Sequence, residues 1–265
     1  MRCVESFDPV GSWGDDTAAV DRTHLRGTEE ATVAFLERLA RGGAALELGI
    51  GTGRIAVPLG ARGVRVDGID FSPAMVAKLR ERPGGENLSI TIANFANVPV
   101  PDTYRLIYVV YNTLFLLLTQ DDQVRCFENV AAHLDDDGSF VVESGGPMVL
   151  YRRLRNDQYV EVEAVEADEV VLDVLLNDAA EQTIRESHVW LSPRGVRLYP
   201  FVQRYASHAE LDLMARIAGL RLTERWGGWN GEPFDSSSGN CVSVYGLKQE
   251  PMALSARTDP EPSSN

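Results

Sequence analysis

A glycine-rich turn at residues 49–53 constrains the fold of this chain more than any other feature. The turn joins a short apolar segment at 44–48 to a segment that has helical character from Ile55 onward, despite Pro58. Glycine lets the backbone turn tightly and lets a ligand approach it closely. Strand, glycine turn and helix in this order are typical of βαβ units, whose parallel sheets are covered by helices on both faces. The sequence therefore predicts an α/β fold with a ligand site at the turn.

The same alternation of strand and helix patterns covers residues 28–147. Further apolar strands are expected at 64–69, 88–93, 106–111 and 140–143. Ser72 is followed by proline, which is the usual start of a helix, and Thr28 and Asp121 are expected to cap two others. An acidic turn is predicted at 135–138, before the last of these strands.

Residues 148–205 show four strand patterns in succession, with no helical pattern between them. The strands are expected at 160–164, 170–175, 183–191 and 196–205. Residues 192–195 predict a hairpin turn, and Pro200 places the last strand at an edge or a bulge, because proline cannot donate to a ladder. We expect a small antiparallel layer over the active-site end. A capping box at 207–210 predicts that a helix and two strands then complete the main fold.

The composition argues against several functional classes for this protein. A net charge of −14 and a pI near 4.7 oppose binding to nucleic acid, which needs a basic surface. No apolar run approaches the roughly 18 residues of a membrane span, and the N-terminus lacks the apolar region of a signal peptide. Cys3, Cys126 and Cys241 form no C-x-x-C pair, and no histidines and acids have metal-ligand spacing. We expect a cytoplasmic protein without a metal, a membrane or a nucleic-acid partner.

Two classes of cofactor could use the glycine turn. Asp70 ends the strand that follows the turn, and an acid at this place can accept hydrogen bonds from ribose hydroxyls. A dinucleotide site needs the spacing G-x-G-x-x-G, with a small residue at position 54. Arg54 stands there instead, and the spacing is G-x-G-x-G, preceded by Glu47.

This pattern resembles motif I of the class I S-adenosylmethionine (SAM)-dependent methyltransferases. The segment ELGIGTGRIAVPLGARGVRVDGIDFSPAMVAKL, residues 47–79, is similar to that superfamily, and the resemblance extends over about residues 28–143 and resumes at Ser207. It implies an α/β, Rossmann-like sheet in the order 3-2-1-4-5-7-6, parallel with one terminal antiparallel strand, to which the small antiparallel β layer is added. The place of that insert further resembles bacterial natural-product methyltransferases, including those that methylate sugar amines.

Five segments are expected on this basis. They are an N-terminal cap segment at 1–27, a SAM-binding core at 28–147, the β insert or substrate lid at 148–205, the remainder of the core at 206–248, and a disordered tail at 249–265.

The resemblance also implies which residues bind SAM. Glu47, Gly49, Gly51 and Gly53 would line its amino acid half, Asp70 would hold the ribose, and Phe71 and Met75 would lie near the adenine. Asn94, followed by Phe95, occupies the place where an acid commonly accepts from the adenine amino group, and an amide oxygen can accept the same bond. Tyr111 and Asn112 would flank the methionine end and the substrate.

Candidate catalytic residues are Glu143, His188 and Tyr111. Glu143 ends its strand at the same edge as Asp70, where it could hold a substrate ammonium or hydroxyl group. His188 shares a strand face with Glu186, so both are candidate acid–base groups if that face looks into the cleft. The residues expected to wall the substrate pocket are Trp13, Tyr199, Phe201 and Trp229. Nine acids and no Lys or Arg lie between Arg155 and Arg185, which suits a cationic substrate.

The expected reaction is methyl transfer from SAM to a small organic acceptor in natural-product biosynthesis, with S-adenosylhomocysteine as the second product. The acceptor would be an amine, such as an amino sugar, or a hydroxyl group. Two alternatives stay open: a SAM-binding enzyme of the same fold that catalyses a non-methylating step such as cyclisation, and a nicotinamide-dependent oxidoreductase. A homodimer is one assembly considered for the chain.

Overall fold

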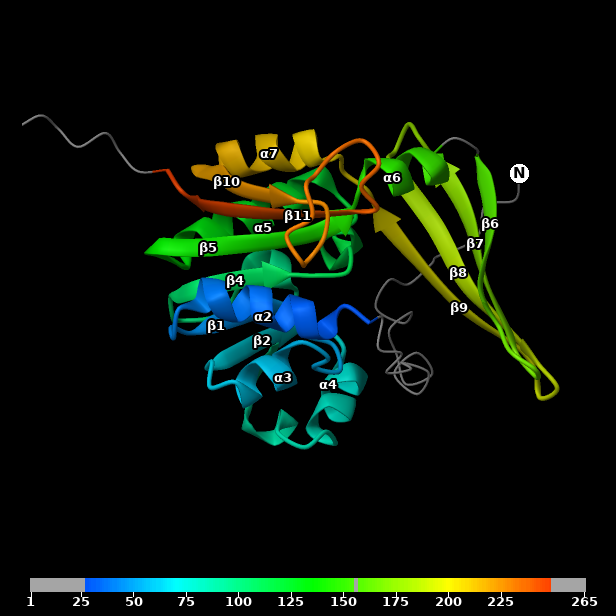
Figure 1. Cartoon of the computed structure of the whole chain (residues 1–265), viewed down its shortest axis with the longest axis horizontal. Coiled ribbons are helices and arrows are strands. Elements are labelled where there is room, and N and C mark those ends of the chain that lie inside the picture. Colours follow the sequence, from blue (N-terminus) through cyan, green and yellow to red (C-terminus); the bar gives the residue numbers. More distant parts are fainter. Residues whose placement is uncertain (1–26, 155–156, 249–265) are drawn as a thin grey trace, which may run out of the picture.

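The structure is a computed structural model that describes residues 27–154 and 157–248 (Figure 1). It contains a main α/β core and a second, antiparallel sheet that stands beside one end of the core. The predicted cap segment, with Trp13, and the predicted tail lie outside the described residues. No helix in the described ranges is long and apolar enough to cross a membrane.

Seven strands form the main sheet, in the order β3-β2-β1-β4-β5-β11-β10. Their bounds are Ala45–Leu48 (β1), Val66–Asp70 (β2), Ser89–Ile92 (β3), Tyr104–Val109 (β4), Leu134–Gly145 (β5), Leu220–Trp226 (β10) and Asn240–Leu247 (β11). Strands β1 to β5 pair in parallel, whereas β11 runs antiparallel to both β5 and β10. The predicted strand order is therefore confirmed, and the antiparallel strand is the last one along the chain.

Helices cover both faces of this sheet, as the βαβ pattern predicts. Their bounds are Glu29–Ala40 (α2), Ala56–Ala61 (α3), Pro73–Arg80 (α4), Gln120–Ala132 (α5), Pro147–Leu154 (α6) and His208–Ile217 (α7). Apolar residues of α2, α3 and α4 belong to one buried cluster, and those of α5 and α7 belong to another. Short 3-10 turns η2 (Gly85–Asn87), η3 (Phe95–Asn97) and η4 (Thr113–Leu116) complete the connections.

Several local predictions for the core need correction. Residues 135–138 are not a free turn, because β5 already begins at Leu134, which pairs with Tyr104 before the register shifts. The turn residues are thus absorbed as an irregularity within one continuous strand. Thr119, not Asp121, caps α5, since its hydroxyl accepts from the Asp122 N–H at 3.0 Å. Helix α6 was not predicted.

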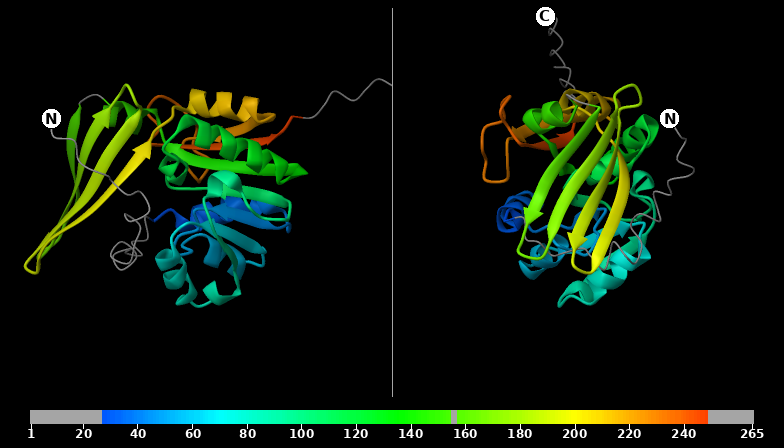
Figure 2. Two further views of the ribbon diagram at one scale, coloured as in Figure 1. Left: turned by 180° about the vertical axis from the view of Figure 1, so that it is seen from behind. Right: turned by 90° about the vertical axis from the view of Figure 1, so that its right-hand side faces the viewer.

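The second sheet contains β6 (Gln158–Val165), β7 (Val170–Asp178), β8 (Thr183–Ser192) and β9 (Gly195–Arg204). These strands pair antiparallel in sequence order, so β9 is an edge strand and Pro200 lies on it, as predicted. Figure 2 shows this sheet side-on and face-on. It follows β5 and α6 in the chain and therefore begins at the edge where the parallel strands of the core end.

A buried polar network joins the second sheet to the core. The Arg204 guanidinium, at the end of β9, donates to Gln123 Oε1 on α5 at 2.7 Å and to Glu210 Oε1 on α7 at 2.9 Å. It also donates to Gln182 Oε1 at 2.7 Å, and the Gln123 amide donates back to the Arg204 carbonyl at 2.8 Å. Because the Arg204 side chain is only 7% exposed, these bonds fix the base of the sheet on two helices of the core.

Candidate active site

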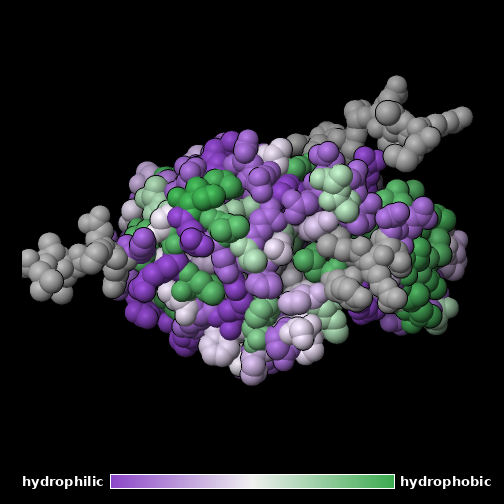
Figure 3. Space-filling model, turned by 90° about the horizontal axis from the view of Figure 1, so that it is seen from above, coloured by the Kyte–Doolittle hydropathy of each residue, from purple (hydrophilic) through white to green (hydrophobic). Residues whose placement is uncertain are grey.

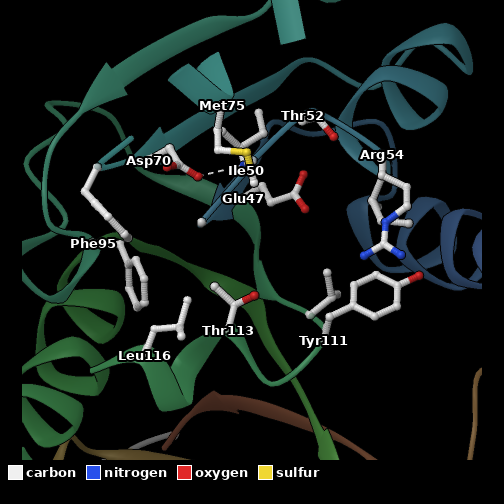
Figure 4. Close-up of a pocket in the computed structure, with 15 residues that line it drawn as sticks. Glu47, Ile50, Thr52, Arg54, Asp70, Met75, Phe95, Tyr111, Thr113 and Leu116 are labelled. Carbon is white, nitrogen blue, oxygen red and sulfur yellow. Dashed lines mark hydrogen bonds between the residues drawn. The ribbon is translucent and has the colours of Figure 1, made fainter. Parts of the chain in front are cut away.

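A cavity lies at the carboxyl ends of β1, β2 and β4, beside the glycine turn (Figure 4). Eight of the predicted cofactor residues line it: Glu47, Gly49, Gly51, Asp70, Phe71, Met75, Phe95 and Tyr111. Seven further lining residues were not predicted: Ile50, Thr52, Arg54, Ile55, Val110, Thr113 and Leu116. Gly53 and Asn94 do not line it.

The three glycines of the turn have positive φ angles but different surroundings. A Cβ atom on Gly49 would lie 2.3 Å from Cγ2 of Thr113, and one on Gly53 would lie 2.9 Å from Leu79. These two positions therefore need glycine for close packing inside the protein. A Cβ atom on Gly51 would meet nothing within 4 Å, although the residue lines the cavity at φ 54°. Gly51 leaves open backbone that a ligand can approach.

Asp70 ties the glycine turn to the end of β2. Its carboxylate accepts from the Gly51 N–H at 2.7 Å and from the Ser72 N–H at 2.8 Å. Burial raises the pKa of Asp70, and the backbone donors partly offset that effect. The acid therefore fixes the turn through its backbone bonds while it lines the cavity (Figure 4).

Glu47 places a second carboxyl group in the cavity wall, on β1. The side chain is buried and accepts a hydrogen bond from the Tyr108 hydroxyl at 3.0 Å. Burial raises the pKa of Glu47 to about 8, although the Tyr108 bond and the positive charge of Arg54 act in the opposite direction. At neutral pH the group is therefore mostly protonated, and a cation bound beside it would favour loss of that proton.

Arg54 and Tyr111 form the opposite part of the wall. The Arg54 guanidinium lies 3.5 Å from the centre of the Tyr111 ring and also pairs with Glu29 at 3.6 Å (Figure 4). Tyr111 has a positive φ of 57°, which is uncommon for a residue with a side chain. Its N–H donates to Glu143 Oε2 at 2.9 Å, so a buried carboxylate holds this turn in place.

Three predicted residues, Glu143, Trp229 and Asn112, do not line the cavity but support the loop that carries Tyr111. The second oxygen of Glu143 accepts from the Trp229 indole N–H at 2.8 Å. Trp229 is buried against Phe35 on α2, edge to face at 5.4 Å. The side-chain oxygen Oδ1 of Asn112 accepts from the Gly145 N–H at 2.7 Å. Glu143, Trp229 and Asn112 thus connect the end of β4 to its neighbours.

Asn94 does not line the cavity, although the next residue, Phe95, does. The side chain is exposed, and its carbonyl oxygen accepts from the Ala96 N–H at 2.8 Å, which caps η3. This cap places the ring of Phe95 in the cavity wall.

The remaining predicted residues lie on one face of the second sheet. We call this the inner face, because two of its residues, Leu175 and Ile184, pack in the same buried cluster as Leu114 and Phe115 of η4. The predicted residues Glu186, His188, Tyr199 and Phe201 share this face through the register of β8 with β9. Strand β9 also contacts η4, whose Thr113 and Leu116 line the cavity. The inner face therefore borders one wall of the cavity.

His188 forms part of a charged cluster on the inner face. Its Nδ1 contacts the buried Asp173, directly opposite on β7, and lies 3.4 Å from Glu163 Oε2. Burial lowers the pKa of His188, but the two carboxylates outweigh this effect and raise it to about 10. Glu186, two residues away, accepts from the Gln203 amide at 2.7 Å. Asp173 and Glu163 were not predicted as site residues.

One group in the described part of the chain has the donor atoms for a metal ion, namely Glu163, Asp173 and His188, within 4.8 Å of one another. A metal ion would have to displace a proton from the His188 imidazole, and the ion pairs of the cluster account for its geometry in the described structure. Among the residues that the structure describes, those that line the cofactor cavity include no histidine or cysteine.

Comparisons with known proteins agree with this geometry. A family described as a methyltransferase domain matches residues 45–138. The structure of the CcbJ methyltransferase from Streptomyces caelestis is similar over 92% of this chain and 100% of that chain, with 35% sequence identity and a TM-score of 0.86. The cypemycin N-terminal methyltransferase from a Streptomyces species is 27% identical over 201 residues, which are 75% of this chain and 81% of that protein.

A second solved structure, of SAM-bound CalS10, an amino pentose methyltransferase from Micromonospora echinaspora, is similar over 88% of this chain and 91% of that chain at 21% identity, with a TM-score of 0.60. The fold and the cavity define a Rossmann-like, cofactor-binding enzyme, and the chain belongs to the class I SAM-dependent methyltransferases. This membership sets the nicotinamide alternative aside.

Proposed function

We propose that the enzyme transfers the methyl group of SAM to the nitrogen of a small amine, in the biosynthesis of a natural product. The observation that carries the proposal is the charged cluster on the inner face of the second sheet, which borders the cofactor cavity. Asp173, Glu186 and Glu163 bring carboxylates to this face. They belong to a part of the chain that is rich in acids, and such a surface attracts a cationic amine.

The residues that line the cavity suit SAM. The open backbone at Gly51 can receive the cofactor closely, and Met75, Phe71 and Phe95 supply apolar surface for the adenine. Asp70 would accept from the ribose hydroxyls, and Glu47 would lie beside the cationic methionine part. We add Arg54, which lines the cavity and would bind the methionine carboxylate. When bound, SAM supplies a methyl group that needs no further activation.

The chain's own residues would then orient the acceptor and exclude water. The acceptor reacts as the neutral amine, so its ammonium form first gives a proton to water. Holding the lone pair of the nitrogen in line with the methyl group then removes much of the barrier, because two reactants become one complex. Tyr111 lines the cavity, and Glu143 positions it by accepting from its backbone N–H. Glu143 is thus proposed as a positioning residue, with Asn112 and Trp229 in support.

The protonation state of His188 favours an amine over a hydroxyl acceptor. A hydroxyl group needs a base to remove its proton, and a base works best when its pKa is near the working pH. With a pKa of about 10, His188 is already protonated at neutral pH. We therefore propose that His188 and its carboxylates, with Tyr199 and Phe201 beside them, shape the acceptor site. The name of the cypemycin relative, an N-terminal methyltransferase, supports nitrogen as the target.

Steady-state kinetics with charge-neutral variants test the role of the inner face. Glu186→Gln and Asp173→Asn are expected to raise KM for a cationic amine about tenfold, with SAM affinity unchanged, because each removes one charge near the acceptor. Glu166→Gln removes the same charge from the exposed connection between β6 and β7 and serves as the control. Equal effects of all three variants, or an unchanged KM in the first two, would contradict the proposed acceptor site.

The cyclisation alternative predicts a different product balance. A methyltransferase releases one S-adenosylhomocysteine for each methyl group transferred, whereas a non-methylating enzyme that binds SAM releases none. Chromatography of reactions with SAM and a panel of amino sugars, free amines and amino-terminal peptides separates the two.

A further inference from the structure

One face of α5 holds the loop that brings Phe95 to the cofactor cavity. Three polar side chains of the helix, each four residues after the last, lie on this face, because residues four apart are neighbours on a helix. Each of them contacts one residue of the loop, and the pairs are Arg125 with Asn97 at 3.1 Å, Asn129 with Ala96 at 2.9 Å and His133 with Val100 at 3.0 Å. Phe95 itself is buried and lines the cavity (Figure 4). The position of one cavity wall therefore depends on α5.

The loop needs this support because its backbone is strained. Val98 has a φ of 41° and is buried. A positive φ is an outlier for a β-branched residue, and such a conformation persists only where the surroundings hold it. Val98 lies between the two loop residues that Asn129 and His133 contact. Loss of one of these contacts is therefore expected to move the loop, and Phe95 with it.

The contacts of His133 identify the protonation state of its ring. Nδ1 lies 2.7 Å from the backbone oxygen of Asn129, and Nε2 lies 3.0 Å from the backbone oxygen of Val100. A carbonyl oxygen only accepts hydrogen bonds, so each of the two ring nitrogens has to donate. A neutral imidazole carries hydrogen on one nitrogen and would turn a lone pair toward the other carbonyl. Only the imidazolium form satisfies both contacts at once.

The surroundings of His133 favour the same charged form. His133 is the C-cap of α5, where the last carbonyls of a helix stabilise a cation. The chain has a net charge of −14, and hydrophilic residues cover much of the core surface in Figure 3. The charged and titratable side chains on the neighbouring elements are engaged elsewhere or exposed: Arg125 contacts Asp122, Asp102 pairs with Arg65, Asp137 pairs with Arg105, Asp135 accepts from Thr103, the Tyr104 hydroxyl donates to Asp67, and Glu128 and Asp136 are exposed.

We propose that His133 is a positioning residue for the cofactor, whose imidazolium form clamps the loop of Phe95 and so keeps this wall of the cavity in place. When the ring gives its proton to water, one of the two hydrogen bonds is lost and the loop loosens. Histidine ordinarily changes its charge between about pH 5 and 8, so SAM binding is coupled to pH through a residue that does not line the cavity. The proposal does not depend on the acceptor and is tested separately from the proposed transfer to nitrogen.

The affinity of the full chain for SAM, measured by isothermal titration between pH 6 and pH 8, tests the proposal. His133→Gln places an uncharged side chain there, as a neutral imidazole would be. At pH 6 the variant is expected to bind SAM about fivefold more weakly than the wild type, which is at the lower end of the usual coupling between two sites. At pH 8 the two proteins are expected to bind SAM equally. Glu47 changes its charge in the same range, but the ratio of the two affinities at each pH cancels its contribution.

Two further variants complete the experiment. His133→Lys supplies a permanent cation with three donors, so it is expected to gain affinity relative to the wild type, about fivefold, between pH 6 and pH 8. It gives the same test with the opposite sign if His133→Gln does not fold. His208→Gln removes a histidine from α7, outside the cavity, and should match the wild type at every pH.

NMR of the 15N-labelled wild type at pH 6 reads the protonation state directly. The signals of His133 are those that disappear in His133→Gln or His133→Lys, and both ring nitrogens are expected to be protonated. An affinity ratio that changes with pH as described, together with this signal, supports the proposal. A ratio that is the same at every pH would show a merely structural role and overturn it, and an unprotonated ring nitrogen of His133 at pH 6 would overturn it as well.

Discussion

The guanidinium of Arg54 lies 3.5 Å from the centre of the Tyr111 ring, and both residues line the cofactor cavity. Arg54 follows the glycine turn after β1, and Tyr111 follows β4. The contact therefore joins the loops after these two strands. A cation held on an aromatic face keeps a defined position and still offers its N–H groups to an anion. The cavity wall thus carries the positive charge of Arg54 and, apart from it, the carboxyl groups of Glu47 and Asp70.

Substitution of Arg54 tests whether it binds the methionine carboxylate. Arg54→Met is expected to weaken SAM binding by about 1.5–3 kcal/mol, the usual value of a charge-assisted hydrogen bond. Decarboxylated SAM lacks the carboxylate, so its affinity should be the same in the variant and in the wild type. Isothermal titration with both ligands gives the comparison. A similar loss for both would show that Arg54 acts only through the structure of Tyr111.

Asp70 is expected to contribute to SAM binding by a similar amount. Asp70→Ala should weaken SAM binding by about 1.5–3 kcal/mol, because it removes charge-assisted bonds to the ribose and frees the Gly51 N–H. Asp67→Ala is the matched control, since Asp67 lies on the same strand and accepts from the Tyr104 hydroxyl, outside the cavity. An unchanged affinity of Asp70→Ala for SAM would contradict the proposal that Asp70 binds the ribose.

The raised pKa of Glu47 predicts that SAM binding releases protons. With a pKa of about 8 in the folded protein, Glu47 is roughly nine-tenths protonated at pH 7. A cationic ligand favours the ionised form, so SAM affinity should increase with pH until about pH 8 and then become constant. Titrations at pH 7 in buffers of different ionisation enthalpy measure the released protons. Glu47→Gln should remove this contribution and leave that of the ligand itself.

Glu47 also makes the stability of the folded protein depend on pH, in a direction that its raised pKa determines. Its pKa is higher in the folded state than the ordinary value of 4.5, so the folded protein binds more protons between pH 4.5 and about 8. Its contribution to the free energy of unfolding is therefore greatest below this range and is lost as pH increases through it. Denaturation of the SAM-free wild type and of Glu47→Gln at several pH values separates this effect from that of other groups.

The network around Arg204 is expected to control the attachment of the second sheet. Arg204→Met should reduce the free energy of unfolding by about 2–4 kcal/mol, because it leaves the buried oxygen of Gln123 and the partly buried oxygen of Gln182 without this donor. Arg216→Met, on the exposed side of α7, is the control and should change stability by about 0.5 kcal/mol or less. Equal effects of the two substitutions would show that the network does not stabilise the joint.

Sequence patterns predicted the core because short-range signals specify it. The glycine turn, the acid at Asp70 and the apolar strands lie within a few residues of the elements that they define, and their order is confirmed. The Asp135–Gly138 prediction failed because an acidic, glycine-containing stretch resembles a turn even when a neighbouring strand absorbs it. Helix α6 has a strong apolar side but lies between a strand end and an insert, where no capping signal was noted.

The site itself was only partly predictable. Arg54 follows the glycine turn directly, so its position at the cavity was open to inference from the sequence. The contacts of Glu143 with Tyr111 and Trp229, and of His188 with Asp173, depend instead on strand register and long-range packing. The position of Glu143 at a strand end therefore indicated the correct edge of the sheet, but only the structure shows its hydrogen-bond partners.

A single competition experiment tests the central claim most directly. The enzyme receives SAM with a 13C-labelled methyl group and an equimolar pair of acceptors that differ only in an amino group and a hydroxyl group at the same position. We predict that the label appears on nitrogen, with an equal amount of S-adenosylhomocysteine, and that NMR of the product shows an N-methyl signal. Label on oxygen would contradict the account.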